Sequence, residues 1–167
     1  QPIMVYRTAA HPLGCPPRTP PESAPGVFRL DIGEVADRGY LGEGWHWPEQ
    51  VFGTSWRWAG AAPQANLYVD LPPGAYTLTL RAQAFVEPRQ LRVLVNGQQV
   101  GEGVTVPVEP LTEFAFPVPA ALIGDGKHIT VTLAYDKTLI PREIGQSADP
   151  RPLSVTVDHV TFTAQRP

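Results

Sequence analysis

Apolar and polar residues alternate with a repeat of two through most of the chain after residue 27. Successive side chains of a strand point to opposite faces, so this repeat predicts strands that bury one face. The clearest run is AYTLTLRAQA, in which the apolar face comprises Tyr76, Leu78, Leu80, Ala82 and Ala84. We predict that residues 75–84 form a sandwich strand with its other face toward water.

The same alternation predicts further strands over residues 28–32, 67–71, 91–95, 114–118, 128–135 and 153–162. Asn96-Gly97 follows one of the apolar segments and favours a type I′ hairpin. Residues 98–100 would form the returning strand of this hairpin. In the last strand the apolar phase changes at Asp158-His159, which predicts a one-residue bulge. The chain is therefore expected to hold about eight antiparallel strands.

Short strands at regular spacing, with no alternation of strands and helices, predict an all-β fold. We expect a jelly-roll β-sandwich without a substantial helix. The proline-rich segment before residue 27 has no apolar period and is typical of a semi-extended linker. The predicted organisation is an arm over residues 1–26 and one sandwich domain over residues 27–165.

Composition narrows the classes of partner. A net charge of -3 provides no basic surface for a phosphate backbone, which argues against nucleic acid. No apolar run reaches the roughly 20 residues of a membrane-spanning helix. Cys15 is the only cysteine, so a disulfide within the chain is impossible.

Residues 31–60 are the least strand-like and most aromatic part of the domain, and they contain all four tryptophans. Tryptophan rings stack on the apolar faces of sugars, so the cluster suggests a carbohydrate ligand. The alternative is that the rings belong to the core, which we favour for Trp45 and Trp58. Trp47 and Trp56 are the candidates for contact with a ligand.

Several motifs resemble a β-jelly-roll accessory domain of bacterial membrane glycosyltransferases and related surface-polysaccharide proteins. The resemblance covers residues 27–163 and rests on GEGWHWPE, SWRWAG, NLYVDLPPGAYTLTLRA, VLVNGQQV and IPREIGQSADPRPLSVTVDHVTF. It implies a galactose-binding-like sandwich outside the cytoplasm, without catalytic activity of its own and carried by a larger membrane protein. It brings no particular ligand. The matching positions are Trp45, Glu49, Arg57, Trp58, Asp149 and Arg151.

Four of these matching residues carry charge, and their roles stay open. Glu49 and Arg57 could clamp the aromatic segment together or face a ligand, and the same alternatives hold for Asp149 and Arg151. We count all four with Trp47 and Trp56 as the candidate ligand-binding set.

Acidic side chains raise a separate possibility. Asp31, Glu34 and Asp37 lie near the end of the first predicted strand, and Asp158 lies in the last. Calcium takes oxygen ligands of this kind, and Asp31, Glu34 and Asp158 are the candidates. Acidic turn residues that face water are the interpretation we favour, with no cofactor.

No motif of an enzyme accompanies the aromatic cluster: a nucleophile elbow, a paired-histidine metal motif and a phosphate-binding loop are all missing from the sequence. The expected function is therefore a carbohydrate-binding accessory module with a glycan or polysaccharide as partner. A structural or protein-interaction domain is the alternative, and a small hydrolase is the third hypothesis.

Overall fold

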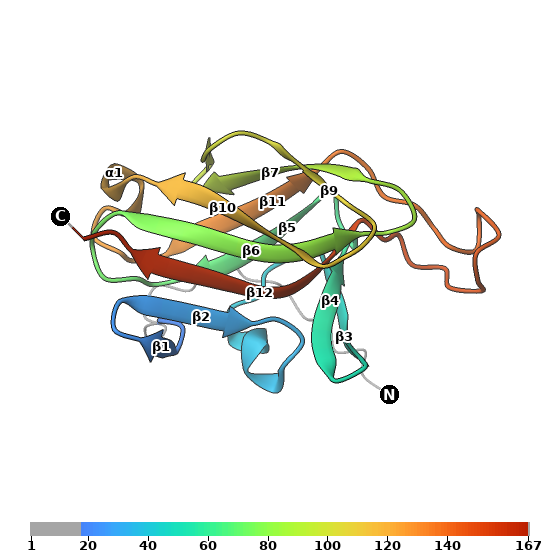
Figure 1. Ribbon diagram of the computed structural model, residues 1–167, viewed down its shortest axis with the longest axis horizontal. Coiled ribbons are helices and arrows are strands. Elements are labelled where there is room, and N and C mark those ends of the chain that lie inside the picture. The colour runs from blue at the N-terminus through green and yellow to red at the C-terminus, as the bar shows by residue number, and fades with distance from the viewer. Residues whose placement is uncertain (1–17, 167) are drawn as a thin grey trace, which may run out of the picture.

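Strands β6 (Tyr76–Ala84) and β11 (Ile129–Tyr135) show how the alternating pattern produces the core. Buried and partly exposed residues alternate along the whole of β6, and the apolar residues of β11 are buried opposite them in the same core. The two strands belong to different antiparallel sheets that face each other (Figure 1). The computed structural model describes residues 18–166 and confirms the predicted jelly-roll sandwich.

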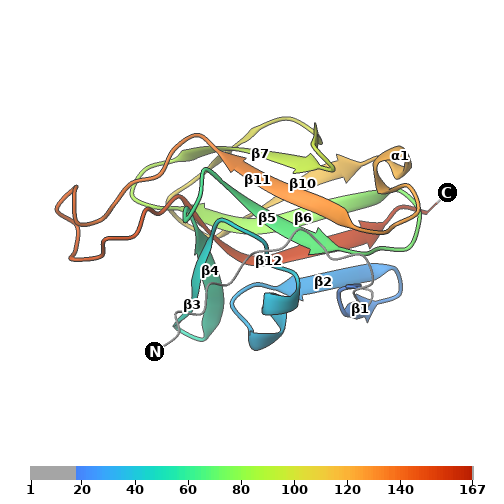
Figure 2. The ribbon, with the colours of Figure 1, turned by 180° about the vertical axis from the view of Figure 1, so that it is seen from behind.

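Strand β12 (Val155–Ala164) is the centre of the seven-stranded sheet, which runs β1-β2-β12-β4-β3 and continues from β12 to β6 and β10 (Figure 2). The other members of this sheet are β1 (Glu22–Ala24), β2 (Val27–Asp31), β3 (Trp45–Val51), β4 (Thr54–Ala59) and β10 (Thr112–Val118). The five-stranded sheet combines β11 with β5 (Gln64–Val69), β7 (Arg89–Val95), β8 (Gln98–Gln99) and β9 (Val104–Val106). Two short helices, η1 (Val35–Gly39) and α1 (Ala120–Ile123), complete the described elements.

Two local predictions are confirmed. Asn96 and Gly97 both have positive φ, 48° and 82°, between β7 and β8, as a type I′ hairpin requires. The register of β12 against β6 shifts between Val157 and His159. This bulge places Asp158 and His159 between two runs of core residues.

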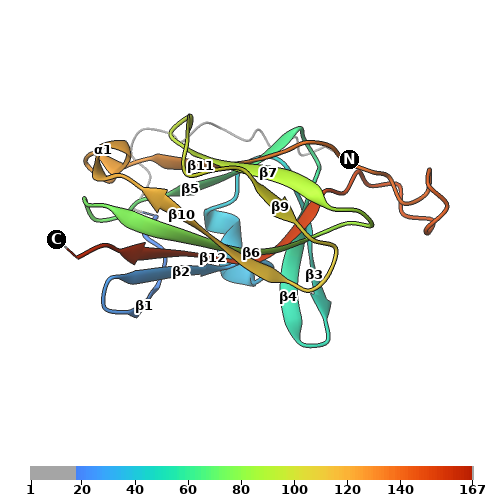
Figure 3. The same ribbon diagram turned by 45° about the horizontal axis from the view of Figure 1, so that its top comes forward.

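The aromatic segment contains more regular structure than expected. Residues 31–60, predicted to be the least strand-like part of the domain, hold η1 and the β3–β4 hairpin. The hairpin extends from the edge of the sandwich (Figure 3), and most of its residues are only partly buried. With neither face fully covered, no strict alternation of apolar and polar residues is needed.

Residues that precede the domain boundary expected at Val27 already contact the sandwich. The backbone N–H of Arg18 donates to Asp70 at 3.0 Å, and β1 pairs with β2. Residues 1–17, with Cys15, lie outside the described part of the chain. No helix among residues 18–166 is long and apolar enough to cross a membrane.

Candidate functional site

The site begins where two distant segments meet along one side of β12. The second half of β12 pairs with β2, and its first half pairs with β4. The turn that follows β2 is therefore brought against β4. Gly33 permits this approach, because its φ is +98° and a Cβ there would lie 2.5 Å from the backbone nitrogen of Trp56.

A buried ion pair joins these two segments. Arg57 donates from Nε and Nη2 to the carboxylate of Asp37 on η1, at 2.7 and 2.8 Å, and from Nη1 to the His46 carbonyl oxygen at 2.9 Å. The backbone N–H of Gly33 also donates to Asp37, at 2.6 Å. All three guanidinium nitrogens of Arg57 are thus engaged within the protein, which is the clamp arrangement considered from the sequence, with Asp37 rather than Glu49 as its partner.

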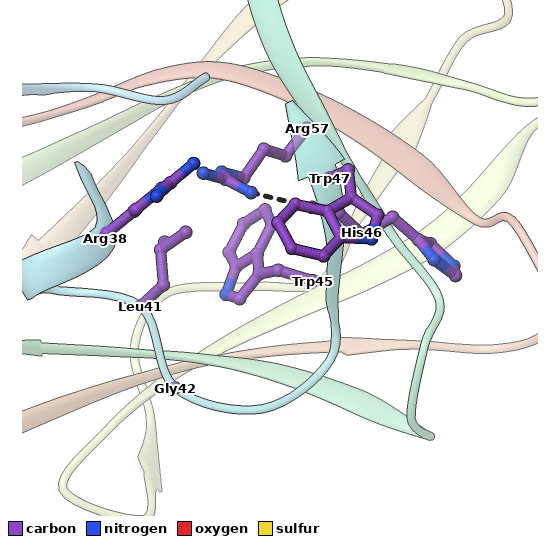
Figure 4. Close-up of a pocket in the computed structure, with 7 residues that line it drawn as sticks. All are labelled: Arg38, Leu41, Gly42, Trp45, His46, Trp47 and Arg57. Carbon is purple, nitrogen blue, oxygen red and sulfur yellow. Dashed lines mark hydrogen bonds between the residues drawn. The ribbon is translucent and has the colours of Figure 1, made fainter. Parts of the chain in front are cut away.

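Next to this pair lies an open groove of about 570 Å³. Its lining comes from η1, the loop after it, the start of β3 and the middle of β4, and comprises Arg38, Leu41, Gly42, Trp45, His46, Trp47 and Arg57 (Figure 4). Leu41 is held by a bridge to Leu67 of β5, so one wall rests on the five-stranded sheet. The groove therefore sits at one end of the sandwich and is shaped by both sheets.

The two groove tryptophans differ in their surroundings. Trp45 packs against the core, and its Nε1 donates to the Asn66 carbonyl oxygen at 2.9 Å. Trp47 is 75% exposed. Trp45 thus forms a fixed wall, whereas Trp47 offers a ring surface that a ligand could cover.

The remaining members of the predicted set lie on the other face of the hairpin. Neighbouring residues of a strand point to opposite faces, so Trp56 points away from Arg57. Glu49 pairs in register with Trp56 and shares its face. The six candidate residues are therefore divided, with Trp47 and Arg57 at the groove and Trp56, Glu49, Asp149 and Arg151 behind it.

The three charged residues of this rear group form an ion-pair network. Arg151 donates from Nη2 to Glu49 at 2.6 Å and to Asp149 at 2.7 Å. The hydrogen bonds from Arg151 hold the pKa of Asp149 below its ordinary value, and those same bonds to Asp149 raise the pKa of Arg151. Glu49 joins β3 to the long loop between β11 and β12, so the network fixes the position of the hairpin.

Trp56 and Trp58 are both partly buried rather than fully enclosed. The ring of Trp58 meets Phe85 edge to face, with centroids 5.6 Å apart. The Nε1 atom of Trp56 is buried and has no hydrogen-bond partner. Of the two rings proposed for ligand contact, Trp47 is the one whose surface is open.

Each carboxylate considered for calcium has a partner of its own within the protein. Asp31 pairs with Arg29, Glu34 accepts from Ser55, and Asp158 pairs with Arg81. Within residues 18–166, no three histidine, cysteine or acidic side chains gather as a metal site. The donor set proposed for calcium is therefore not assembled.

Sequence reasoning did not single out two polar side chains of the lining, those of Arg38 and His46. Arg38 follows Asp37 on η1 and is exposed, and the His46 ring hydrogen-bonds the Pro152 carbonyl oxygen at 2.7 Å. Their place in the aromatic and charged segment 31–60 was the only available signal. Their convergence on one groove depends on pairing between β12 and β4.

Comparisons with known proteins support the fold. No family model matches the sequence, and no curated protein matches it. The structure is similar to the CBM22-1 xylan-binding domain of Xyn10C from Paenibacillus barcinonensis, with a TM-score of 0.56 and 12% identity over 84% of this chain and 94% of that one. It also resembles the C-terminal CBM6 of the laminarinase LamC from Zobellia galactanivorans, with a TM-score of 0.51 and 11% identity over 82% and 98%.

A third similar structure is the GH26-CBM35 β-(1,4)-mannanase from Podospora anserina, with a TM-score of 0.55 and 14% identity. The match covers 85% of this chain and 28% of the mannanase, so the chain corresponds to a fraction of that enzyme. At these identities the similarity establishes a shared jelly-roll architecture of the kind found in carbohydrate-binding modules.

Proposed function

We propose that this domain is a carbohydrate-binding accessory module without catalytic activity of its own, and that the groove beside Trp47 is its binding site. The observation that supports this proposal most directly is that Trp47 is 75% exposed and lines a groove of which Trp45 forms another wall. A large aromatic ring left open to water beside a concave surface is typical of a site that stacks on a ligand.

The groove offers both kinds of contact that a sugar needs. The Trp47 ring can cover the apolar face of a pyranose, while the Arg38 guanidinium can donate to its hydroxyl groups. The clamp between Arg57 and Asp37 and the packing of Trp45 hold the walls in place before a ligand arrives. Such preorganisation reduces the entropic cost of binding.

The larger setting is also a proposal. The resemblance to accessory domains of membrane glycosyltransferases supports a parent protein that handles polysaccharide outside the cytoplasm, as a membrane glycosyltransferase or a related surface protein. The match to only part of a mannanase supports an attached module rather than a self-sufficient unit. In that setting the domain would hold or orient a glycan for its parent.

One observation favours a protein-interaction domain as the second candidate. Val35 on η1 is 82% exposed, and Phe52 at the tip of the β3–β4 hairpin is fully exposed. Both apolar side chains could rest on a protein partner. Phe52 is therefore the side chain that separates the two candidates.

Isothermal titration calorimetry with xylan, β-(1,4)-mannan and laminarin oligosaccharides, extended by a glycan array, tests the proposal. The Trp47→Ala variant should lose about tenfold or more in affinity, as truncation of an aromatic anchor does. The Phe52→Ala variant removes another exposed aromatic ring from the same hairpin and should bind like the unmodified protein. Absence of binding to every glycan on the array would leave the interaction domain as the better proposal.

A further inference from the structure

We infer that the groove is selective for an acidic sugar, a ring that carries a carboxylate, so that the partner is an acidic polysaccharide. This inference rests on the proposed function and adds the ligand class. Its starting point is the charge of the groove: two arginines line it, and no aspartate or glutamate does so. That excess contrasts with the net charge of -3 of the whole chain.

Only one of the two arginines has its charge balanced. Arg57 donates twice to Asp37, and both side chains are buried. Among residues 18–166, no carboxylate forms an ion pair with Arg38, which is exposed to water. The ion pair between Arg57 and Asp37 is neutral overall, so Arg38 gives the groove one positive charge.

The position of Arg38 is set by the clamp next to it. Asp37 points inward from η1 to Arg57, and Arg38 is the next residue along the helix. The backbone N–H of Tyr40 donates to the Asp37 carbonyl oxygen at 2.8 Å, which closes the turn around Arg38. The guanidinium groups of Arg38 and Arg57 point toward each other at one side of the groove (Figure 4).

A carboxylated sugar matches this arrangement in two respects. The planar guanidinium of Arg38 has donors spaced to bind both oxygens of a carboxylate. The Trp47 ring can stack on the sugar face, which is apolar whether or not the ring carries an acid. A neutral sugar would use the ring but leave the charge of Arg38 uncompensated.

The test compares a polygalacturonate hexamer with the same hexamer after its carboxyl groups have been reduced to alcohols. Affinities are measured by calorimetry for the unmodified protein and for Arg38→Gln and Lys127→Gln. Lys127 is an exposed cation in the turn before β11, and this turn follows α1 at the end of the sandwich away from the β3–β4 hairpin (Figure 1). Dextran sulfate and unmodified dextran report whether any polyanion suffices.

We expect the acidic hexamer to bind about tenfold or more tightly than the reduced one, with this preference lost in Arg38→Gln and kept in Lys127→Gln. Equal affinity for both hexamers would overturn the inference and leave the proposed function standing. Equal losses in the two variants, or dextran sulfate binding that Arg38→Gln does not weaken, would overturn it in favour of general electrostatic attraction. Failure of every glycan to bind would overturn both proposals.

Discussion

The guanidinium of Arg57 meets the carboxylate of Asp37 with two hydrogen bonds, 2.7 and 2.8 Å long, in the buried interior between η1 and β4. This pair joins η1, which follows β2, to the β3–β4 hairpin, which begins at Trp45. It also determines where the groove arginine Arg38 stands. Stability and binding are therefore expected to depend on the same contact.

Replacing Asp37 by Asn should lower the free energy of unfolding by about 3–5 kcal/mol, because it leaves the buried Arg57 guanidinium without a counter-charge. Urea unfolding followed by circular dichroism measures this loss. Asp31→Asn breaks the exposed pair with Arg29 and is the control, with an expected loss below about 1 kcal/mol. Similar losses for the two variants would contradict the assigned role of Asp37.

Substitutions at Gly44 and Gly53 test whether the backbone packs closely next to the groove, with Gly53 as the control for Gly44. Both have positive φ, +93° and +81°, so alanine costs roughly 1–2 kcal/mol at either position. A Cβ on Gly44 would in addition lie 2.1 Å from the Gln64 carbonyl oxygen, whereas a Cβ on Gly53 meets nothing within 4 Å. Gly44→Ala should therefore unfold at a clearly lower urea concentration than Gly53→Ala, and equal midpoints would refute the close approach.

Asp70 should make stability depend on pH in the acid range. Burial raises its pKa, but hydrogen bonds from the backbone N–H groups of His128 and Arg18 outweigh burial and lower the pKa below 3.8. A lowered folded-state pKa stabilises the fold above pH 3.8, and this stabilisation is lost as the pH falls through the folded-state value.

The stability difference between the unmodified protein and Asp70→Asn should accordingly be larger at pH 6 than at pH 2. Unfolding by urea at several pH values gives this comparison. A difference that stays constant over the range would show that the Asp70 carboxylate is not preferentially ionised in the folded state.

Tryptophan fluorescence should report one accessible ring among four. Acrylamide should quench chiefly Trp47, because Trp45, Trp56 and Trp58 are partly buried. Trp47→Phe should therefore remove most of the quenchable emission, while Trp58→Phe should leave the quenching constant nearly unchanged. Protection of the Trp47 signal by a bound glycan would locate the ligand at this ring.

The core strands were predictable because burial on one face imposes alternation. The residues of β6 and the Asn96-Gly97 turn carried this information locally. The β3–β4 hairpin was missed because its partly exposed faces impose no such repeat. Local patterns therefore describe the sandwich better than the hairpin that extends from it.

The site was only partly predictable for a different reason. Glu49 and Arg57 are close in sequence and were considered as a pair, yet each has its partner elsewhere. Arg57 meets Asp37 and Glu49 meets Arg151 because the last strand places β2, β4 and the long loop together. Nothing in the spacing of these residues reveals that arrangement.

The central position of β12 has a consequence for synthesis of the protein. Three earlier strands, β2, β4 and β6, dock on residues 155–164, which are made after all of them. The hairpin that bears Trp47 therefore lacks the strand with which β4 pairs in the sheet until β12 has emerged from the ribosome. Such long-range pairing slows folding, and nascent chains that stop before β12 should be exposed to chaperones and proteases with the groove unformed.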